Sequence, residues 1–324
     1  MSRIVLATLG SLGDLHPYLA IARELTTRGH RAAVATSEVY RERVLAEGVP
    51  FHPVRPDLRP VLDTPGALAR YMDAGHGSER VVRELVVPFL TEAYEDTLAA
   101  AAGADLLVGH PLTLTAPMAA EKLGIPWLST TLAPFLFFSA SDPPVPPGAA
   151  WVESLRHFGP APHRMIFALA RRLSEPWFEP LVALRARLGL EPIGHPMFEG
   201  GVSPCGTLAL FSPLIGPPQP DWPEGVTVTG YCFLDHPKLD PLPDGLERFL
   251  DAGDPPIVFT LGTSAVHDAS DFYSAARDHA RALGRRAVLL TGRDAGNHVA
   301  GGPDAFVADY APYSRVFPRA AAIV

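Results

Sequence analysis

The first residues of the chain constrain its fold more than any other stretch. An apolar run from Ile4 to Leu9 is typical of a buried strand, and it leads into the turn Gly10-Ser11-Leu12-Gly13-Asp14-Leu15-His16-Pro17. Apolar residues then recur at helical spacing from Tyr18 to Leu25, and Gly29 ends the pattern. A strand joined to a helix by a glycine-rich turn is the basic unit of α/β proteins, whose functional residues gather above the strand ends.

The turn places an acid at that edge. Gly10 and Gly13 let the backbone turn sharply and let a ligand approach it closely. Pro17 is expected in the first turn of the helix, where its missing N–H costs nothing. Asp14 is therefore expected to face the crevice above the sheet.

The same alternation continues along the first part of the chain. Further strands are predicted at residues 31–36, 49–54, 104–109, 127–131 and 207–211. Helical stretches lie between them, among them one that Ser37 is placed to cap and one at 116–123 that Gly124 closes. The βαβα order indicates a parallel sheet with helices on both faces.

The pattern restarts after a proline-rich stretch at 212–223, which is predicted to lie in an interdomain linker at about 212–240. Strands at 256–261 and 286–291 enclose a helix at 272–283. We therefore predict an N-terminal domain over 1–225 and a second α/β domain over 241–324. The last residues, 320–324, read as a buried parallel strand without a helix to cover it, so we expect this domain to be incomplete.

Composition narrows the choice of partners. The chain has 324 residues and a formal net charge of −8, with no basic run, which argues against nucleic acid or an anionic membrane surface as the main partner. No apolar stretch approaches the length of a membrane span. The two cysteines are too few for a disulfide framework, so a cytoplasmic location is the default expectation.

Several motifs, taken in chain order, resemble the GT-B glycosyltransferases that use nucleotide-diphospho-sugars, most closely the bacterial and sterol types. Besides the first turn they are Phe211-Ser212-Pro213, Asp221-Trp222-Pro223-Glu224-Gly225, Val228-Thr229-Gly230-Tyr231 and Phe259-Thr260-Leu261-Gly262-Thr263. The resemblance covers nearly the whole chain. It implies two facing Rossmann-like domains, an acceptor site in the first and a donor site in the second.

The resemblance also implies a base. In the family an acid or histidine three residues before the proline takes the proton of the acceptor hydroxyl, and that position is Asp14 here. His110 stands where plant members carry the supporting acid, so a reversed Asp14–His110 dyad is predicted. Two plainer readings stay open: Asp14 caps the helix, and His110 is structural.

Acceptor-binding residues are expected at Gly13 and His16, and at Phe135, Phe137 and Phe138, because the family places its acceptor pocket there. His16 reads equally as a capping or partly buried imidazole. The aromatic cluster reads equally as core packing. The implied acceptor is a small, lipophilic, hydroxylated molecule.

Donor-binding residues are expected in the second domain. Gly262, Thr263 and Ser264 follow a strand and precede a helix, a place where backbone N–H groups meet phosphate. The resemblance adds Arg293 for the diphosphate, and Tyr310 and Pro312 for the base of a UDP- or dTDP-sugar. No metal and no further cofactor are expected.

The family's His-Gly-Gly-x-Gly-Thr stretch would begin directly after Val324, so we expect the chain to lack part of the donor site and to be unable to complete catalysis alone. One alternative is a non-catalytic acceptor-binding or partner-activating module derived from a glycosyltransferase. Another is a GT-B sugar-nucleotide epimerase. A nicotinamide dehydrogenase is disfavoured, because the first turn is G-x-x-G rather than G-x-G-x-x-G.

Overall fold

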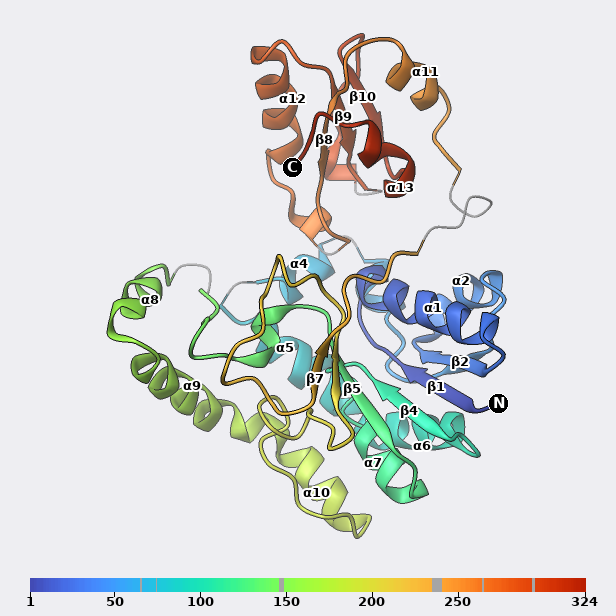
Figure 1. The fold of residues 1–324 in the computed structure, drawn as a ribbon, viewed down its shortest axis with the longest axis vertical. Helices are drawn as coiled ribbons and strands as arrows, with labels where there is room; N and C mark the ends of the chain where they lie inside the picture. Colours follow the sequence, from blue (N-terminus) through green and yellow to red (C-terminus); the bar gives the residue numbers. More distant parts are fainter. Residues whose placement is uncertain (65, 74, 146–148, 235–240, 264, 293–294) are drawn as a thin grey trace. The chain divides into compact units, whose positions relative to one another are not determined.

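The structure is a computed structural model that describes residues 1–64, 66–73, 75–145, 149–234, 241–263, 265–292 and 295–324. These residues form two compact units. Unit 1 holds residues 1–59 and 73–233, and unit 2 holds residues 60–72 and 234–324. Each unit is built on its own parallel sheet (Figure 1). Among the described residues, no helix is both long and apolar enough to cross a lipid bilayer.

The sheet of unit 1 has seven strands, all parallel to their neighbours. In sheet order they are β3 (Phe51–Pro53), β2 (Arg31–Thr36), β1 (Arg3–Ala7), β4 (Leu106–Gly109), β5 (Trp127–Thr131), β6 (Thr207–Ala209) and β7 (Val226–Val228). The register aligns Ala7 with Gly109, and Gly109 with Ser129. The carboxyl ends of β1, β4 and β5 therefore lie side by side, and the turns that follow them meet at one edge.

Helices cover both faces of this sheet. They are α1 (Leu12–Thr27), α2 (Arg41–Ala46), α5 (Gly77–Arg80), α6 (Leu90–Ala101), α7 (Ala116–Leu123), α8 (Trp151–Ser154), α9 (Ala161–Ser174) and α10 (Glu179–Arg187). Val5 and Ala7 pack into one core cluster with α6 and α7. Ile4 and Leu6 alternate with them and so point to the other face, where α1 buries Leu15 and Leu19. The predicted doubly wound α/β arrangement is confirmed.

Two local predictions are wrong. α1 begins at Leu12, so Pro17 lies inside the helix rather than in its first turn. The start is set instead by a capping box, in which Ser11 is the N-cap and Asp14 closes the box. Ser37 makes no side-chain cap; its hydroxyl oxygen accepts the Leu58 N–H at 2.9 Å.

The proline-rich stretch 212–223 lies within unit 1, where it joins β6 to β7. Val226 of β7 pairs with Thr207 of β6, so the chain returns to the first sheet after the prolines. From residue 73 onward the chain stays in unit 1 as far as Phe233.

Unit 2 contains a parallel sheet of four strands with helices on both faces. In sheet order the strands are β10 (Ala305–Ala308), β9 (Ala287–Leu290), β8 (Ile257–Thr260) and β11 (Ala322–Ile323). The helices are α4 (Ala67–Tyr71), α11 (Leu246–Asp251), α12 (Phe272–Ala282) and α13 (Tyr313–Val316), and the short α3 (Arg59–Leu62) spans the boundary between the units. Tyr273 of α12 belongs to one core cluster and Leu246 of α11 to another. The predicted second α/β unit is thus confirmed.

Candidate active site

The acid of the first turn meets a histidine that follows β4. His110 comes directly after β4, and its N–H donates to the Ala7 carbonyl of β1 at 3.0 Å. This bond places the buried His110 ring beside the turn that follows β1. His110 Nε2 lies 3.4 Å from Asp14 Oδ1. The structure therefore brings together the two residues of the predicted dyad.

Asp14 also holds the start of α1. Its Oδ2 accepts the Ser11 N–H at 2.7 Å and the Ser11 hydroxyl at 3.1 Å. Gly10 makes room for this arrangement, since a Cβ at that position would lie 2.2 Å from Asp14 Oδ2, and its φ of +143° is one that other residues rarely adopt. The capping geometry and the contact with His110 thus coexist, each on a different carboxylate oxygen.

The protonation of His110 follows from its other nitrogen. Nδ1 accepts the Leu112 N–H at 3.2 Å, so a neutral ring carries its proton on Nε2, facing Asp14. The ring is also held edge-on by Tyr18, with 6.0 Å between the ring centroids. The imidazole is therefore oriented as a hydrogen-bond donor toward the carboxylate.

The charge state of Asp14 reflects these contacts. Burial raises the pKa of its carboxyl group, but the hydrogen bond and charge of His110, together with the Ser11 hydrogen bonds, lower it more. The net pKa of Asp14 lies below its ordinary value, so the carboxylate is ionised at neutral pH. It can accept a hydrogen bond and, from a reacting hydroxyl, a proton.

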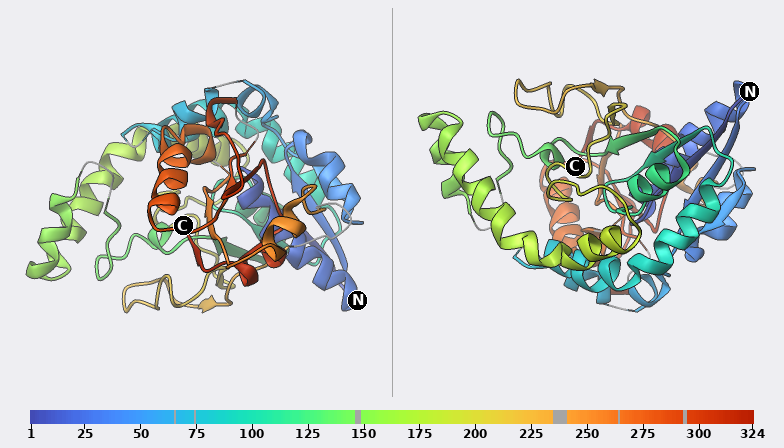
Figure 2. Two further views of the ribbon diagram at one scale, coloured as in Figure 1. Left: turned by 90° about the horizontal axis from the view of Figure 1, so that it is seen from above. Right: turned by 90° about the horizontal axis from the view of Figure 1, so that it is seen from below.

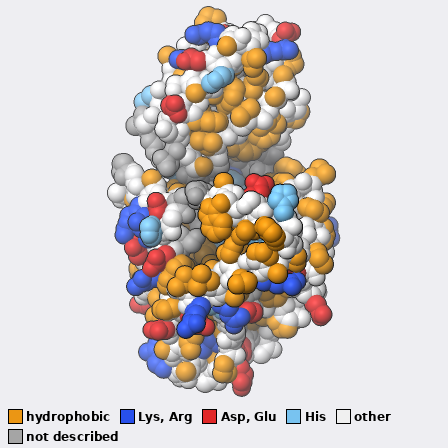
Figure 3. Space-filling view, turned by 90° about the vertical axis from the view of Figure 1, so that its left-hand side faces the viewer, with side chains coloured by type: hydrophobic (Ala, Val, Ile, Leu, Met, Phe, Trp, Pro, Cys, Tyr) orange, Lys and Arg blue, Asp and Glu red, His pale blue; other side chains and the backbone are white. Residues whose placement is uncertain are grey.

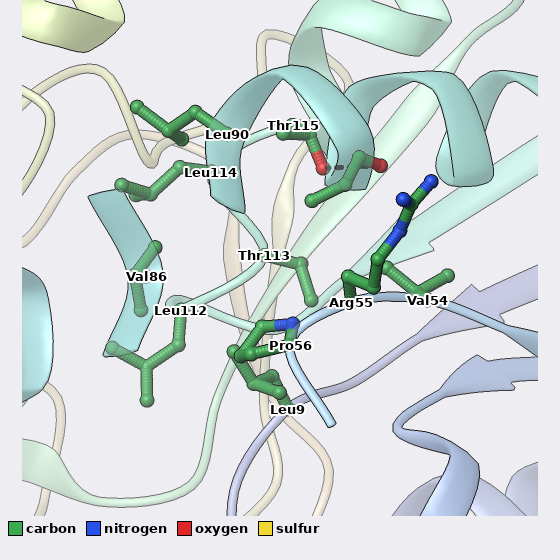
Figure 4. A pocket seen from close by; sticks show the side chains of 11 residues that line it. Leu9, Val54, Arg55, Pro56, Val86, Leu90, Leu112, Thr113, Leu114 and Thr115 are labelled. Atoms are coloured by element: carbon green, nitrogen blue, oxygen red, sulfur yellow. Dashed lines mark hydrogen bonds between the residues drawn. The ribbon is translucent and has the colours of Figure 1, made fainter. Parts of the chain in front are cut away.

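A small, mostly apolar pocket of about 20 Å³ lies beside the turn that follows His110 (Figure 4). Aliphatic side chains and a proline make up most of its lining: Leu9, Val54, Pro56, Val86, Leu90, Leu112 and Leu114. Arg55 also lines it, but its guanidinium is paired with Asp96 at 2.8 Å. Leu112 connects the two features, because its N–H holds His110 while its side chain lines the pocket.

The three predicted acceptor phenylalanines lie in the loop that follows β5. Phe137 packs on Trp222, with 4.3 Å between the ring centroids, and Phe138 packs on Phe198 at 4.5 Å. Phe135, by contrast, is 55% exposed. Two of the three side chains are therefore engaged in aromatic clusters, and the third is open to solvent.

The other predicted acceptor residues lie in the first turn of α1 and just after it. Gly13 is exposed, and His16 is half-buried.

Asp221 is a residue that sequence reasoning left without a role. Its carboxylate accepts the Ser139 hydroxyl at 2.5 Å, the Ala140 N–H at 2.7 Å and the Ser141 N–H at 3.2 Å. It thus ties the loop after β5 to the proline-rich stretch between β6 and β7. The signal in the sequence was its position as the first residue of the motif Asp221-Trp222-Pro223-Glu224-Gly225.

The predicted donor residues lie at the carboxyl edge of the second sheet. Gly262 and Thr263 follow β8, whereas Ser264 and Arg293 lie outside the described residues. The helix predicted at 272–283 is confirmed as α12. A short 3₁₀ turn at Ala265–Asp268 intervenes, and α12 begins only at Phe272, so its N-terminus is not next to Gly262.

Tyr310 and Pro312 follow β10 at the same edge. Pro312 is the N-cap of α13, and Tyr310 is 42% exposed. Tyr313 stacks on Phe317 with 4.4 Å between centroids, and its hydroxyl lies 3.1 Å from the Thr260 hydroxyl at the end of β8. This contact joins the segments that follow β8 and β10.

The buried Asn297 was missed by sequence reasoning. Its amide donates to the carbonyl oxygens of Val266 at 2.7 Å and Thr291 at 2.8 Å. It thereby joins the turn after β8 to the end of β9.

Comparison with known proteins gives a consistent picture. Residues 4–139 match the glycosyltransferase family 28 N-terminal domain. The chain is 31% identical to O-mycaminosyltylonolide 6-deoxyallosyltransferase of Streptomyces fradiae, over 99% of this chain and 75% of that protein. It is 25% identical to sterol 3-beta-glucosyltransferase UGT80B1 of Arabidopsis thaliana, over 99% of this chain and 53% of that protein.

Solved structures share the fold. The crystal structure of the glycosyltransferase of kitacinnamycin superposes with a TM-score of 0.63 at 21% identity, covering 99% of this chain and 74% of that chain. The common architecture is GT-B.

Proposed function

The chain belongs to the GT-B glycosyltransferases of antibiotic and sterol type, which are nucleotide-sugar-dependent transferases, and from this premise we propose a specific reaction. It moves a hexose from a nucleotide-diphospho-sugar to a hydroxyl group of a small lipophilic acceptor. The configuration at the anomeric carbon inverts. Asp14 is the general base.

The contact of Asp14 with His110 is the observation that carries the proposal. The acceptor oxygen attacks the anomeric carbon while its proton passes to Asp14 Oδ1. The bond from that carbon to the diphosphate oxygen breaks, and the nucleoside diphosphate leaves with the electron pair. One displacement gives inversion, and a positioned base contributes about 10²- to 10⁴-fold to the rate.

His110 acts through Asp14 as a positioning residue. With its proton on Nε2, it orients the carboxylate and favours the ionised form. It lowers the basicity of Asp14 but keeps the group deprotonated over a wider pH range. That is the reverse of a histidine base supported by an acid.

The lining of the pocket supports a lipophilic acceptor. Its walls are aliphatic, and the charge of Arg55 is already paired. The names of the two curated relatives refer to a tylonolide and to a sterol, both largely apolar molecules. Phe135, Gly13 and His16 complete the proposed acceptor site.

The proposed donor site lies in unit 2. Gly262 and Thr263 would contact the diphosphate, and Tyr310 and Pro312 would hold the base. Ser264 and Arg293 remain part of this proposal. The donor is a UDP- or dTDP-sugar, and no metal is required if cationic side chains and backbone N–H groups stabilise the leaving diphosphate.

The test combines binding with turnover. Calorimetric titration with UDP and dTDP measures donor binding, and incubation of UDP-glucose or dTDP-glucose with a sterol and a macrolide aglycone, read by mass spectrometry, measures transfer. Because residues 1–324 are expected to be unable to complete catalysis alone, transfer is assayed with the family's His-Gly-Gly-x-Gly-Thr stretch and the remainder of the donor domain joined after Val324. We expect this extended chain to give a glycosylated product with inverted configuration, as shown by its anomeric proton coupling. Nucleotide binding by the extended chain without transfer to either acceptor, in a folded sample, would contradict the proposal and favour a non-catalytic module.

A further inference from the structure

Tyr18 is a buried tyrosine on the helix that carries the proposed base. It lies four residues after Asp14 in α1, so the two side chains share one face of that helix. α1 lies against β2, which is next to β1 in the sheet (Figures 1 and 2). Hydrophobic side chains are exposed elsewhere on unit 1, as the lower part of Figure 3 shows, but Tyr18 is not among them, because its exposed fraction is 0%.

The hydroxyl group of Tyr18 begins a chain of hydrogen bonds that ends at β4. Thr130 of β5 has one hydroxyl proton, which it donates to the Gly109 carbonyl oxygen at 2.9 Å. The Thr130 oxygen therefore accepts the hydrogen bond that joins it to the Tyr18 hydroxyl. Because Gly109 directly precedes His110, the chain ends at the residue before the histidine of the proposed site.

The ring of Tyr18 makes a second contact, with the histidine itself. It meets the His110 imidazole edge-on, with 6.0 Å between the ring centroids and 69° between the ring planes. The Tyr18 ring is thus fixed by β5 at its hydroxyl end while its body packs on the side chain that follows β4. To turn away from Asp14 Oδ1, which is 3.4 Å from Nε2, the imidazole would have to displace a ring that is held in place.

The electrostatic environment keeps the phenol a hydrogen-bond donor. Burial raises the pKa of Tyr18 strongly, the hydrogen bond with Thr130 lowers it less, and the charge of Asp14 raises it further. Burial and the charge of Asp14 also raise the pKa of Tyr40, whose hydroxyl donates to the Gly10 carbonyl oxygen at 2.9 Å. Both phenols near Asp14 are therefore neutral, and of these two Tyr18 is the one that packs on the imidazole.

Packing alone does not require the hydroxyl group. A phenylalanine would fill nearly the same volume, without a buried polar group that has to be paired. The hydroxyl adds a directional link between α1, which carries Asp14, and the two strands β4 and β5. Since His110 follows β4, this link fixes the distance between the acid and the histidine.

We propose that Tyr18, held by Thr130, is a positioning residue that keeps the His110 imidazole against the Asp14 carboxylate. It acts through His110 and touches no reacting atom. Its importance for transfer rests on the proposed function. Its effect on the geometry of the pair does not, and can be measured without a sugar donor or an acceptor.

The experiment is an NMR titration of the Asp14 carboxyl carbon in the 324-residue chain, labelled with carbon-13 at aspartate. The signal that disappears in Asp14→Asn identifies this carbon. His110 lowers the pKa of Asp14 in the native chain, so displacing the imidazole should raise that pKa. Tyr18→Phe should therefore move the pKa of Asp14 upward, in the direction of His110→Ala.

Three further variants locate the cause. Thr130→Val breaks the same link from its other end and should raise the pKa of Asp14 as much as Tyr18→Phe does. The double variant should raise it no further, because the two hydroxyl groups belong to one chain. Thr130→Ser keeps the hydroxyl group and should leave the pKa of Asp14 at its native value.

Tyr273→Phe is the matched control. Tyr273 is 2% exposed, and its hydroxyl donates to the Leu290 carbonyl oxygen at 2.7 Å, but it lies in unit 2. The substitution removes a buried hydroxyl group with one hydrogen bond, as Tyr18→Phe does. It should leave the pKa of Asp14 unchanged.

Turnover measures the consequence for the proposed reaction. In the extended chain, Tyr18→Phe should lower kcat by about tenfold and leave KM for the donor unchanged, because the misplaced pair no longer holds the base in line. Absence of transfer by the unaltered extended chain would contradict the proposed function. The pKa comparison would still decide the role of Tyr18.

Three results would overturn the proposal. Tyr18→Phe could lower the melting temperature without changing the pKa of Asp14, and Tyr18 would then serve packing alone. Thr130→Val could leave that pKa unchanged while Tyr18→Phe raises it. Tyr273→Phe could raise it as much as Tyr18→Phe. If Tyr18→Phe does not fold, Thr130→Val against Thr130→Ser makes the same comparison.

Discussion

At the scale of single residues, Asp14 is the side chain on which the proposed chemistry depends. Asp14→Asn keeps an oxygen that can accept the Ser11 N–H, so the helix cap is retained. We expect transfer to fall by about 10²-fold or more, with nucleotide affinity unchanged. Product formation and calorimetric titration measure the two quantities. An equal loss of both would show that the substitution acts on folding or on the donor site.

His110→Ala tests the positioning role through pH. In the native protein, His110 lowers the pKa of Asp14, so the base stays ionised into mildly acidic solution. Without the imidazole this pKa rises, and the acidic limb of the kcat/KM profile should move to higher pH. The profile of the unaltered enzyme is the reference. A limb that stays in place would contradict the role assigned to His110.

Gly10 is the residue that makes the Asp14 geometry sterically possible. Gly10→Ala places a Cβ 2.2 Å from Asp14 Oδ2, in addition to the strain of a positive φ. Gly29→Ala is the matched control, since its φ is +83° but no atom lies within 4 Å of the added Cβ. The control should cost about 1–2 kcal/mol from strain alone, and Gly10→Ala more. Thermal melting measures the loss of stability of each variant. Equal losses for Gly10→Ala and Gly29→Ala would contradict the steric argument.

At the scale of elements, the bounds of a helix were predicted correctly where the sequence contains the residue that ends it. The bounds of α7 match the prediction, because Gly124 at its end adopts the left-handed conformation that stops a helix. The start of α1 was misplaced because Pro17 was weighed above the Ser11–Asp14 capping box. The short β7 was not predicted as a strand, since only its pairing with β6 distinguishes it from a loop.

The loop after β5 offers a test at this scale. Asp221→Ala removes the acceptor of three hydrogen bonds from that loop, and we expect a loss of about 1–3 kcal/mol in stability and faster proteolysis within residues 134–142. Denaturant unfolding and mapping of the cleavage sites measure these effects. Proteolysis at an unchanged rate would show that the aromatic contacts of Phe137 and Phe138 hold the loop alone.

The same carboxylate predicts a pH dependence. Burial raises the pKa of Asp221, but the hydrogen bonds from Ser139, Ala140 and Ser141 lower it more, so its folded-state pKa lies below the ordinary value. Its stabilising effect is therefore complete above the unfolded pKa and is lost as pH falls through the folded one. The difference in unfolding free energy between the native chain and Asp221→Ala should shrink toward acidic pH.

At the scale of the whole molecule, two units with separate cores should unfold separately. We expect two calorimetric transitions. A donor nucleotide should raise the transition temperature of unit 2 only. At about a hundred times its Kd, the stabilisation is about 2.7 kcal/mol. Scans with UDP, dTDP and no nucleotide test this. If the nucleotide raised only the transition temperature of unit 1, this would contradict the donor site proposed in unit 2.

The division into units also marks the limit of sequence reasoning. The alternation of strands and helices predicted two α/β parts, because that pattern is local. Residues 60–72 group with unit 2 although they interrupt unit 1 in the sequence, and no local pattern indicates this. The contact between Asp14 and His110 depends on β1 and β4 being neighbours in the sheet. The prediction of this pair came from the resemblance to a family and not from a local pattern.

The two oxygens of Asp14 have a consequence for laboratory evolution. Oδ2 serves the architecture of α1, whereas Oδ1 faces His110. A library of variants selected only for heat resistance would therefore accept Asn at this position, because Asn retains the helix cap. The proposed activity would be lost without affecting the selection. Any selection on this protein therefore has to include an assay of turnover. Asp and Asn differ at one side-chain atom, which the proposed base requires and the helix cap does not.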